Sequence, residues 1–164
     1  MLTIRCTRKP LKGLDDEVPP ERTLPTNRLG DWYANFLFAR RAGLIICVSE
    51  RSLLPVFVEA GDPPSFIPRF QEAVRSVLQR VVAASDVVDY EARETAQIRI
   101  GATASRRVLG SLNDLASLTR FTIEEHPAID LRNLAIELAE TPCAPVNYES
   151  PRSVSLALLR RVYS

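Results

Sequence analysis

Three short apolar segments, separated by turn-forming residues, lie between positions 32 and 58 and constrain the fold more than any other feature. Large side chains at every second position of residues 32–38 are typical of a strand that buries one face. Residues 44–48 are apolar throughout, as in a central strand, and residues 53–58 return after a short turn. Connections of this length favour neighbouring antiparallel strands, so the sequence predicts a three-stranded meander.

A different spacing follows the meander. Apolar residues recur every three or four positions, which indicates amphipathic helices, and residues 66–81 show this most clearly. Residues 106–122 repeat the pattern. Two more helices are expected to begin after the N-cap residues Asp130 and Ser150.

Two further strands are expected, at residues 2–6 and 97–101. The predicted fold class is therefore α+β: an antiparallel sheet of about five strands with a central meander, and helices packed on one face. The proline-containing breaks are too short for interdomain linkers, so residues 1–164 are expected to form a single domain. Pro55 lacks the N–H group that a central strand needs, which predicts an edge position for the last strand of the meander.

The charge balance limits the classes of function. Lysine and arginine total 21, nearly all of them arginine, against 20 acidic residues, and a net charge of +1 argues against nucleic-acid binding through overall charge. No apolar run approaches the roughly 20 residues of a membrane span, and the N-terminus lacks the apolar stretch of a signal peptide. The 3 scattered cysteines and single histidine form neither a disulfide framework nor a zinc pattern. We therefore expect a cytoplasmic protein without metal or cofactor.

The segment Thr103-Ala104-Ser105-Arg106-Arg107 lies at a predicted strand-to-helix junction and is the main candidate site. Backbone N–H groups in a first helical turn carry partial positive charge, which two arginines reinforce. We expect a negative group to compensate, either a protein carboxylate or a bound phosphate or carboxylate. The alternative is structural: Ser105 or Thr103 caps the helix, and the arginines pair with neighbouring acids.

One helical face extends from this junction. Arg106, Gly110 and Asn113 are aligned because they lie at i, i+4 and i+7. Glycine costs about 1 kcal/mol inside a helix. Gly110 therefore indicates the close approach of a ligand or of another backbone, or else tight packing on the sheet. Asn113 and Asp114 are candidate ligand contacts, and the alternative role of Asp114 is to neutralise Arg107.

Asn35 is a further candidate because it lies in a predicted strand among large apolar residues. A buried amide needs partners for its donors and for its oxygen. Asn35 either orders the neighbouring turn or shares one pocket with Tyr33 and the Arg106 region. The sequence leaves both alternatives open.

No nucleotide-binding loop, nucleophile elbow or metal motif occurs, so no catalytic residue is predicted. Cys47 is expected in a buried strand, and Cys143 has no neighbouring histidine to activate it. His126 fits a solvated helix end.

The arginine doublets at residues 40–41, 106–107 and 160–161 give an alternative binding site, a basic patch for nucleic-acid phosphates.

Three stretches carry a resemblance to a known family: Ile4-Arg5-Cys6-Thr7-Arg8-Lys9, Gly30-Asp31-Trp32-Tyr33-Ala34-Asn35, and residues 103–114. They resemble an uncharacterised bacterial family of domains of unknown function. Its members occur alone or joined to a plasmid ORF-three-like domain, and they often carry asparagine where Ala104 stands here. The resemblance implies a bacterial α+β domain and brings no established activity, cofactor or catalytic residue.

The absence of catalytic motifs favours a small cytoplasmic protein-binding or regulatory module, by analogy in a toxin–antitoxin or defence setting. The edge strand at Pro55 is the expected contact for a protein partner. Two alternatives stay open. One is a nucleic-acid-binding protein that uses the arginine doublets, and the other is an enzyme that acts on an anionic ligand at residues 103–107.

Overall fold

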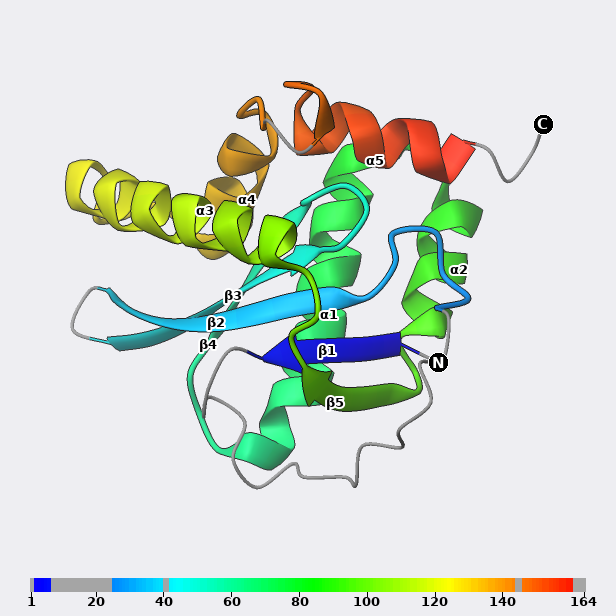
Figure 1. Ribbon diagram of the computed structural model, residues 1–164, viewed down its shortest axis with the longest axis horizontal. Helices are drawn as coiled ribbons and strands as arrows, with labels where there is room; N and C mark the ends of the chain where they lie inside the picture. Colours follow the sequence, from blue (N-terminus) through cyan, green and yellow to red (C-terminus); the bar gives the residue numbers. More distant parts are fainter. Residues whose placement is uncertain (1, 7–24, 40–41, 144–145, 161–164) are drawn as a thin grey trace.

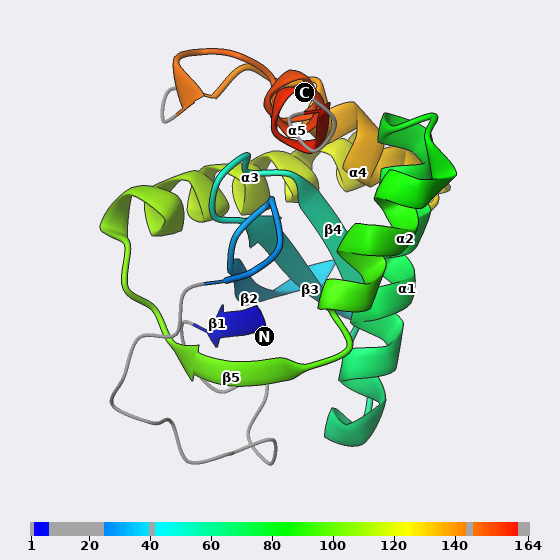
Figure 2. The ribbon, with the colours of Figure 1, turned by 90° about the vertical axis from the view of Figure 1, so that its right-hand side faces the viewer.

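The computed structural model describes residues 2–6, 25–39, 42–143 and 146–160 (Figure 1). These residues form a five-stranded sheet and helices on both of its sides (Figure 2). The elements follow one another as β1 (Leu2–Cys6), β2 (Trp32–Ala39), β3 (Ala42–Ser49), β4 (Pro55–Glu59), α1 (Pro63–Val81), α2 (Ser85–Glu94), β5 (Ile98–Ala102), α3 (Arg106–Glu125), α4 (Leu131–Ala139) and α5 (Pro151–Arg160). The α+β class and the strand positions are confirmed, whereas α2 was not expected.

The sheet is mixed, with the strand order β4-β3-β2-β1-β5. The predicted meander β2-β3-β4 is antiparallel throughout and is confirmed. The expectation of an entirely antiparallel sheet is wrong, because β1 runs parallel to both β2 and β5. Long connections allow this: residues 7–31 separate β1 from β2, and two helices separate β4 from β5. Side-chain alternation is the same for both strand directions, so the sequence pattern did not distinguish them.

Helices pack on both faces of the sheet, so the expectation of one covered face is also wrong. The Trp32 ring meets Phe70 of α1 edge to face, with ring centroids 5.4 Å apart. The hydroxyl of the next residue, Tyr33, contacts Ser105 at the start of α3. Because successive residues of a strand point to opposite faces, α1 and α3 lie on opposite sides of β2. The apolar segment of β3 agrees with this, since residues 44–48 are all buried.

Strand β4 lies at an edge of the sheet, as Pro55 predicted. Its first four residues are buried, and α1 and α4 pack against it. The expected role of this strand in pairing with another chain stays a prediction. Within the described residues, no helix is both long and apolar enough to cross a bilayer.

The apolar face of α1 forms much of the core beside the sheet, and its buried residues are those that the periodicity predicted: Phe66, Phe70, Val74, Val77, Leu78 and Val81.

Helix α5 is attached to the β3–β4 turn by a buried hydroxyl contact. The Ser155 hydroxyl donates to the Ser52 oxygen at 2.8 Å, and the Ser52 oxygen lies 2.6 Å from that of Ser49. All three side chains are buried, so this contact stabilises the packing of α5 and does not belong to a surface site.

Candidate binding site around the start of helix α3

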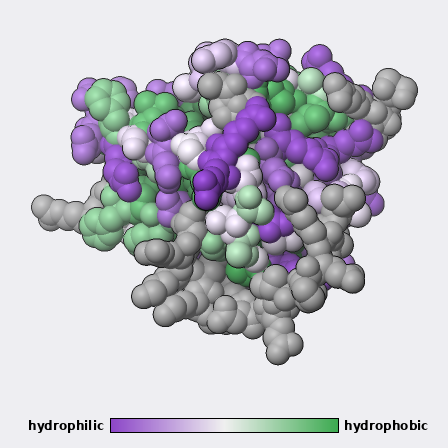
Figure 3. All heavy atoms as spheres, in the orientation of Figure 1, coloured by the Kyte–Doolittle hydropathy of each residue, from purple (hydrophilic) through white to green (hydrophobic). Residues whose placement is uncertain are grey.

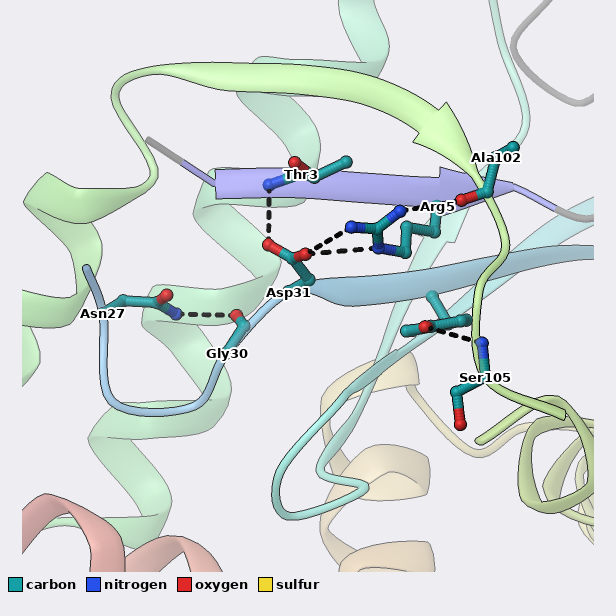
Figure 4. A network of polar contacts seen from close by, with 8 residues as sticks. Thr3, Arg5, Asn27, Gly30, Asp31, Ala102 and Ser105 are labelled. Carbon is teal, nitrogen blue, oxygen red and sulfur yellow. Dashed lines mark hydrogen bonds and ion pairs between the residues drawn. The ribbon is translucent and has the colours of Figure 1, made fainter. Parts of the chain in front are cut away.

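A buried ion pair fixes the strands on which the site is built (Figure 4). One carboxylate oxygen of Asp31 accepts the Thr3 backbone N–H at 3.1 Å. The other accepts from Arg5 through Nε at 3.2 Å and Nη2 at 3.0 Å, with side-chain exposures of 12% for Arg5 and 4% for Asp31. Arg5 Nη1 also donates to the Ala102 carbonyl at 2.9 Å. One guanidinium therefore joins β1, the residue before β2 and the end of β5.

Tyr33 connects this strand framework to α3. Its hydroxyl oxygen accepts the Ser105 backbone N–H at 3.2 Å, and the side chain is completely buried. Burial raises the pKa of the Tyr33 phenol, and the nearby Glu50 carboxylate raises it further. The group is therefore a neutral hydroxyl at physiological pH, and it positions the backbone rather than acting as a base.

The structural alternative for Ser105 is confirmed, because its Oγ accepts the Val108 N–H at 3.3 Å and so caps α3. Thr103 lies half-buried in the link between β5 and this cap. Arg106 and Arg107, the first residues of α3, are exposed, and the first turn contains no acidic residue. Among the described residues, no ion pair includes either arginine. The expected pairing with neighbouring acids is therefore not found there, and a bound anion stays a prediction.

The face of α3 that begins at Arg106 lies next to β2. Asn35 Nδ2 donates to Asn113 Oδ1 at 3.4 Å, so these two candidate residues come together. Gly110, between Arg106 and Asn113 on the helix, is exposed, and an added Cβ atom would meet nothing within 4 Å. Tight packing of Gly110 on the sheet is thus wrong. Asp114 is exposed and forms no ion pair with Arg107 within the described part of the chain.

Within the described residues, the candidate residues form two side-chain contacts. Tyr33 joins Ser105, and Asn35 joins Asn113. Three hollows of about 230, 410 and 540 Å³ are lined by other parts of the chain, between α1 and α4, between α2 and α5, and at the α3–α4 turn.

The three cysteine thiols of the described residues are held in their protonated form. Burial raises the pKa of the Cys6 thiol to about 12 and that of Cys47 well above its usual range. The pKa of Cys143 is also raised, by burial and by Asp114, so the thiolate forms are disfavoured. Within the described ranges, no three His, Cys, Asp or Glu side chains cluster as metal ligands. His126 is the exposed C-cap of α3, which agrees with its predicted place at a helix end.

Sequence reasoning missed two exposed aromatic residues. The alternation predicted for residues 32–38 is confirmed by the continuous pairing of β2 with β3, which places Phe36 and Phe38 on the same face as Trp32. Their side chains are 43% and 65% exposed. In Figure 1, this end of β2 reaches past α1. Figure 3 shows hydrophobic side chains at the left of the molecule, over the β2–β3 hairpin. The strand is thus buried at one end and open at the other, which alternation alone does not show.

The comparisons with known proteins point to one family. The family described as a domain of unknown function, DUF6933, matches residues 3–154 and so spans the sheet and nearly all of the helical part. No curated protein matches the chain.

Proposed function

Because the chain belongs to the DUF6933 family of domains of unknown function, we propose its role from its geometry: it is a protein-binding module. The observation that carries this proposal is the pair Phe36 and Phe38, two large apolar side chains exposed on one face of β2. Such residues are common in cores, and paired on a surface they mark contact sites. They are the contact surface of the module.

The size of this surface favours a small contact. The exposed fractions of Phe36 and Phe38, 43% and 65%, together amount to about one whole phenylalanine side chain. Full burial of one such side chain is worth roughly 1.5–3 kcal/mol. A stable homodimer needs about 800 Å² from each copy, several times what two partly exposed rings supply. The surface therefore fits a short segment of another protein better than a second copy of this chain.

The setting of the module belongs to the same proposal. The family resemblance, with members expected alone or joined to a plasmid ORF-three-like domain, fits a bacterial, cytoplasmic module that acts through a partner. A regulatory role in a defence or toxin–antitoxin system is one use of such a module.

The nucleic-acid alternative has less support. Arg106 and Arg107 begin α3, whereas Arg160 ends α5 on another side of the molecule (Figures 1 and 2). Arg40, Arg41 and Arg161 lie outside the described residues. The doublets therefore do not form one basic surface within the described part. For the enzymatic alternative, the Ser105 hydroxyl oxygen already accepts the Val108 N–H as the helix cap.

Affinity capture with matched variants tests the protein-binding proposal. The full chain, the double variant Phe36→Ser/Phe38→Ser and the control Phe121→Ser are immobilised, and host proteins retained by each are quantified by mass spectrometry. Phe121 is 60% exposed on α3, which makes it a matched surface aromatic. We expect a host protein retained by the wild type and by Phe121→Ser, and about tenfold less by the double variant. Equal retention by all three would contradict the proposal.

A further inference from the structure

We infer that the hollow between α1 and α4 binds a free α-amino acid with an apolar side chain. This site goes beyond the proposed protein contact at Phe36 and Phe38, since neither ring lines the hollow. The volume of the hollow is about 230 Å³. Drug-sized ligands fill pockets of roughly 300–1,000 Å³, so this hollow has room for a smaller metabolite.

The walls of the hollow come from three elements that meet at the outer strand of the sheet. Helix α1 supplies one side, the start of α4 supplies the other, and β4 contacts both helices. The apolar part of the lining consists of Phe57, Ala73, Val77 and Leu131. Phe57 and Val77 are buried, whereas Ala73 and Leu131 are half-buried. An aliphatic or aromatic side chain that enters the hollow therefore meets an apolar surface.

Arg69 brings a positive charge to one wall, and the fold holds its guanidinium group in place. Its Nε donates to the Ser65 carbonyl at 3.2 Å, and its Nη1 donates to the Glu59 carbonyl. Both acceptors are neutral, so neither balances the charge. Nη2 lies 2.6 Å from the position that a Cβ atom on Gly61 would take, so this glycine gives the guanidinium group its room. A guanidinium group that is already fixed loses little freedom when it binds a carboxylate.

Two more charged side chains line the hollow, Arg132 at the start of α4 and Glu72 on α1. Both are exposed, and neither forms an ion pair with another described residue. Glu72 follows Arg69 by three positions on the helix, a spacing at which opposite charges often pair. Because these two do not pair here, the hollow is lined by two cations and one anion.

This set of groups matches the two charges of a free amino acid. Arg69 and Arg132 suit its carboxylate, because guanidinium groups bind carboxylates through charge-assisted hydrogen bonds. Glu72 suits its ammonium group, and the Ser76 hydroxyl, which also lines the hollow, adds a neutral donor or acceptor. An amino acid inside a peptide chain carries neither backbone charge, so these groups favour the free molecule over a protein segment.

Chemical-shift titration of the isotope-labelled full chain tests the inference. The probes are L-leucine, N-acetyl-L-leucine, which lacks the ammonium charge, and L-leucinamide, which lacks the carboxylate. We expect L-leucine to bind with a Kd of about 0.1–1 mM and to shift the amides of Ala73, Ser76 and Leu131. Each analogue should bind about tenfold more weakly, because one charge-assisted contact is lost.

Two variants assign the charges. Arg132→Gln should weaken the binding of L-leucine up to about fivefold and leave that of L-leucinamide unchanged, since the amide has no carboxylate to bind. Glu72→Gln should weaken L-leucine by a similar factor and should not weaken N-acetyl-L-leucine. Arg80→Gln is the matched control, because Arg80 is an exposed arginine in the last turn of α1 and does not line the hollow. Circular dichroism shows whether each variant is folded.

Gly61→Ala tests the position of Arg69 without removing its charge. The added methyl group displaces the guanidinium group, which lies at the end of a flexible side chain, so the fold should tolerate the change. We expect about threefold weaker binding of L-leucine and little change in the urea midpoint. Unchanged binding by this variant would contradict the role of the fixed guanidinium group.

The inference would be overturned by the absence of amide shifts with L-leucine, by shifts that gather at another hollow, or by analogues that bind as well as L-leucine. The double variant Phe36→Ser/Phe38→Ser should bind L-leucine like the wild type, because neither ring lines the hollow. Failure of the titration therefore leaves the protein-binding module standing, and failure of the affinity capture leaves the amino-acid site standing.

Discussion

The hydroxyl of Tyr33 accepts the backbone N–H of Ser105 at 3.2 Å, and this contact sets the position of α3 over the sheet. The two residues are 72 positions apart, one in β2 and the other at the N-cap of the helix. Because Tyr33 is completely buried, its hydroxyl has a fixed place, and the helix begins where that hydroxyl lies. The exposed helix face from Arg106 to Asn113 consequently follows β2.

Replacing Tyr33 by phenylalanine tests the weight of this contact. The variant keeps the ring and leaves the Ser105 N–H without its acceptor. We expect the free energy of unfolding to fall by about 1–2 kcal/mol, since an unsatisfied buried donor costs this much. Urea denaturation measures it. Tyr90→Phe is the control, because the Tyr90 hydroxyl lies 3.5 Å from the Thr26 carbonyl and should contribute little. Equal effects of both substitutions would contradict the assignment.

The Arg5–Asp31 pair should be the most costly polar interaction to break. Asp31→Asn leaves the Arg5 charge largely buried with a weaker partner, and we expect a loss of about 3 kcal/mol. Asp89→Asn is the matched control, because Asp89 pairs with Arg75 on the surface, at side-chain exposures of 54% and 40%. That change should cost less than about 1 kcal/mol. Chemical denaturation of both variants decides the point, and similar losses would show that the buried pair has no special role.

Much of the fold follows from local pattern. The meander was predictable because alternation at residues 32–38 and the short turns both describe neighbouring strands. Helix α1 was predictable because six buried residues keep helical spacing. The parallel pairing of β1 was not, since it depends on where a long connection returns the chain. Helix α2 was missed because only Val87, Val88 and Glu91 are buried along it, too few for a clear stripe.

The candidate site was predictable only in its helical part. The spacing of Arg106, Gly110 and Asn113 shows a common face, and the cap at Ser105 follows from its residue type. The Arg5–Asp31 pair joins two residues that are 26 positions apart in the sequence. Their contact depends on the parallel pairing of β1 with β2, and a local sequence pattern carries no information about that pairing. Exposure of Phe36 and Phe38 depends on where α1 ends relative to β2. The tertiary arrangement, rather than the secondary-structure propensity of the residues, determines both the ion pair and the exposure of the two rings.

Gly110 should be replaceable with a gain in stability. An added Cβ meets nothing within 4 Å, and alanine is better than glycine in a helix by nearly 1 kcal/mol. We therefore expect Gly110→Ala to raise the free energy of unfolding by about 0.5–1 kcal/mol. Gly43→Ala is the opposite case, because its Cβ would lie 2.7 Å from that of Ala60 and 2.8 Å from the Phe36 ring. That variant should lose about 1 kcal/mol or more. A destabilised Gly110→Ala would show that the open space beside this helix face is absent.

Glu91 should make stability depend on pH. This carboxyl group of α2 is 2% exposed and accepts the Arg28 N–H at 2.8 Å. Burial raises its pKa above the ordinary value of 4.5, although hydrogen bonds from the loop at residues 27–29 oppose the shift. The folded state therefore holds this proton more tightly than the unfolded state. The stabilisation is complete below pH 4.5 and is lost as the pH rises through the raised pKa.

Comparison with Glu91→Gln isolates this effect from that of the other carboxylates. Glutamine resembles the protonated form and does not titrate, so the two proteins should be closest in stability in acid. As the pH rises from about 4 to about 7, the stability difference should shift in favour of the glutamine variant. Urea denaturation across this range measures it, with the exposed Glu124→Gln as control. Parallel pH profiles for wild type and Glu91→Gln would mean that the buried carboxyl group titrates alike in the folded and unfolded chain.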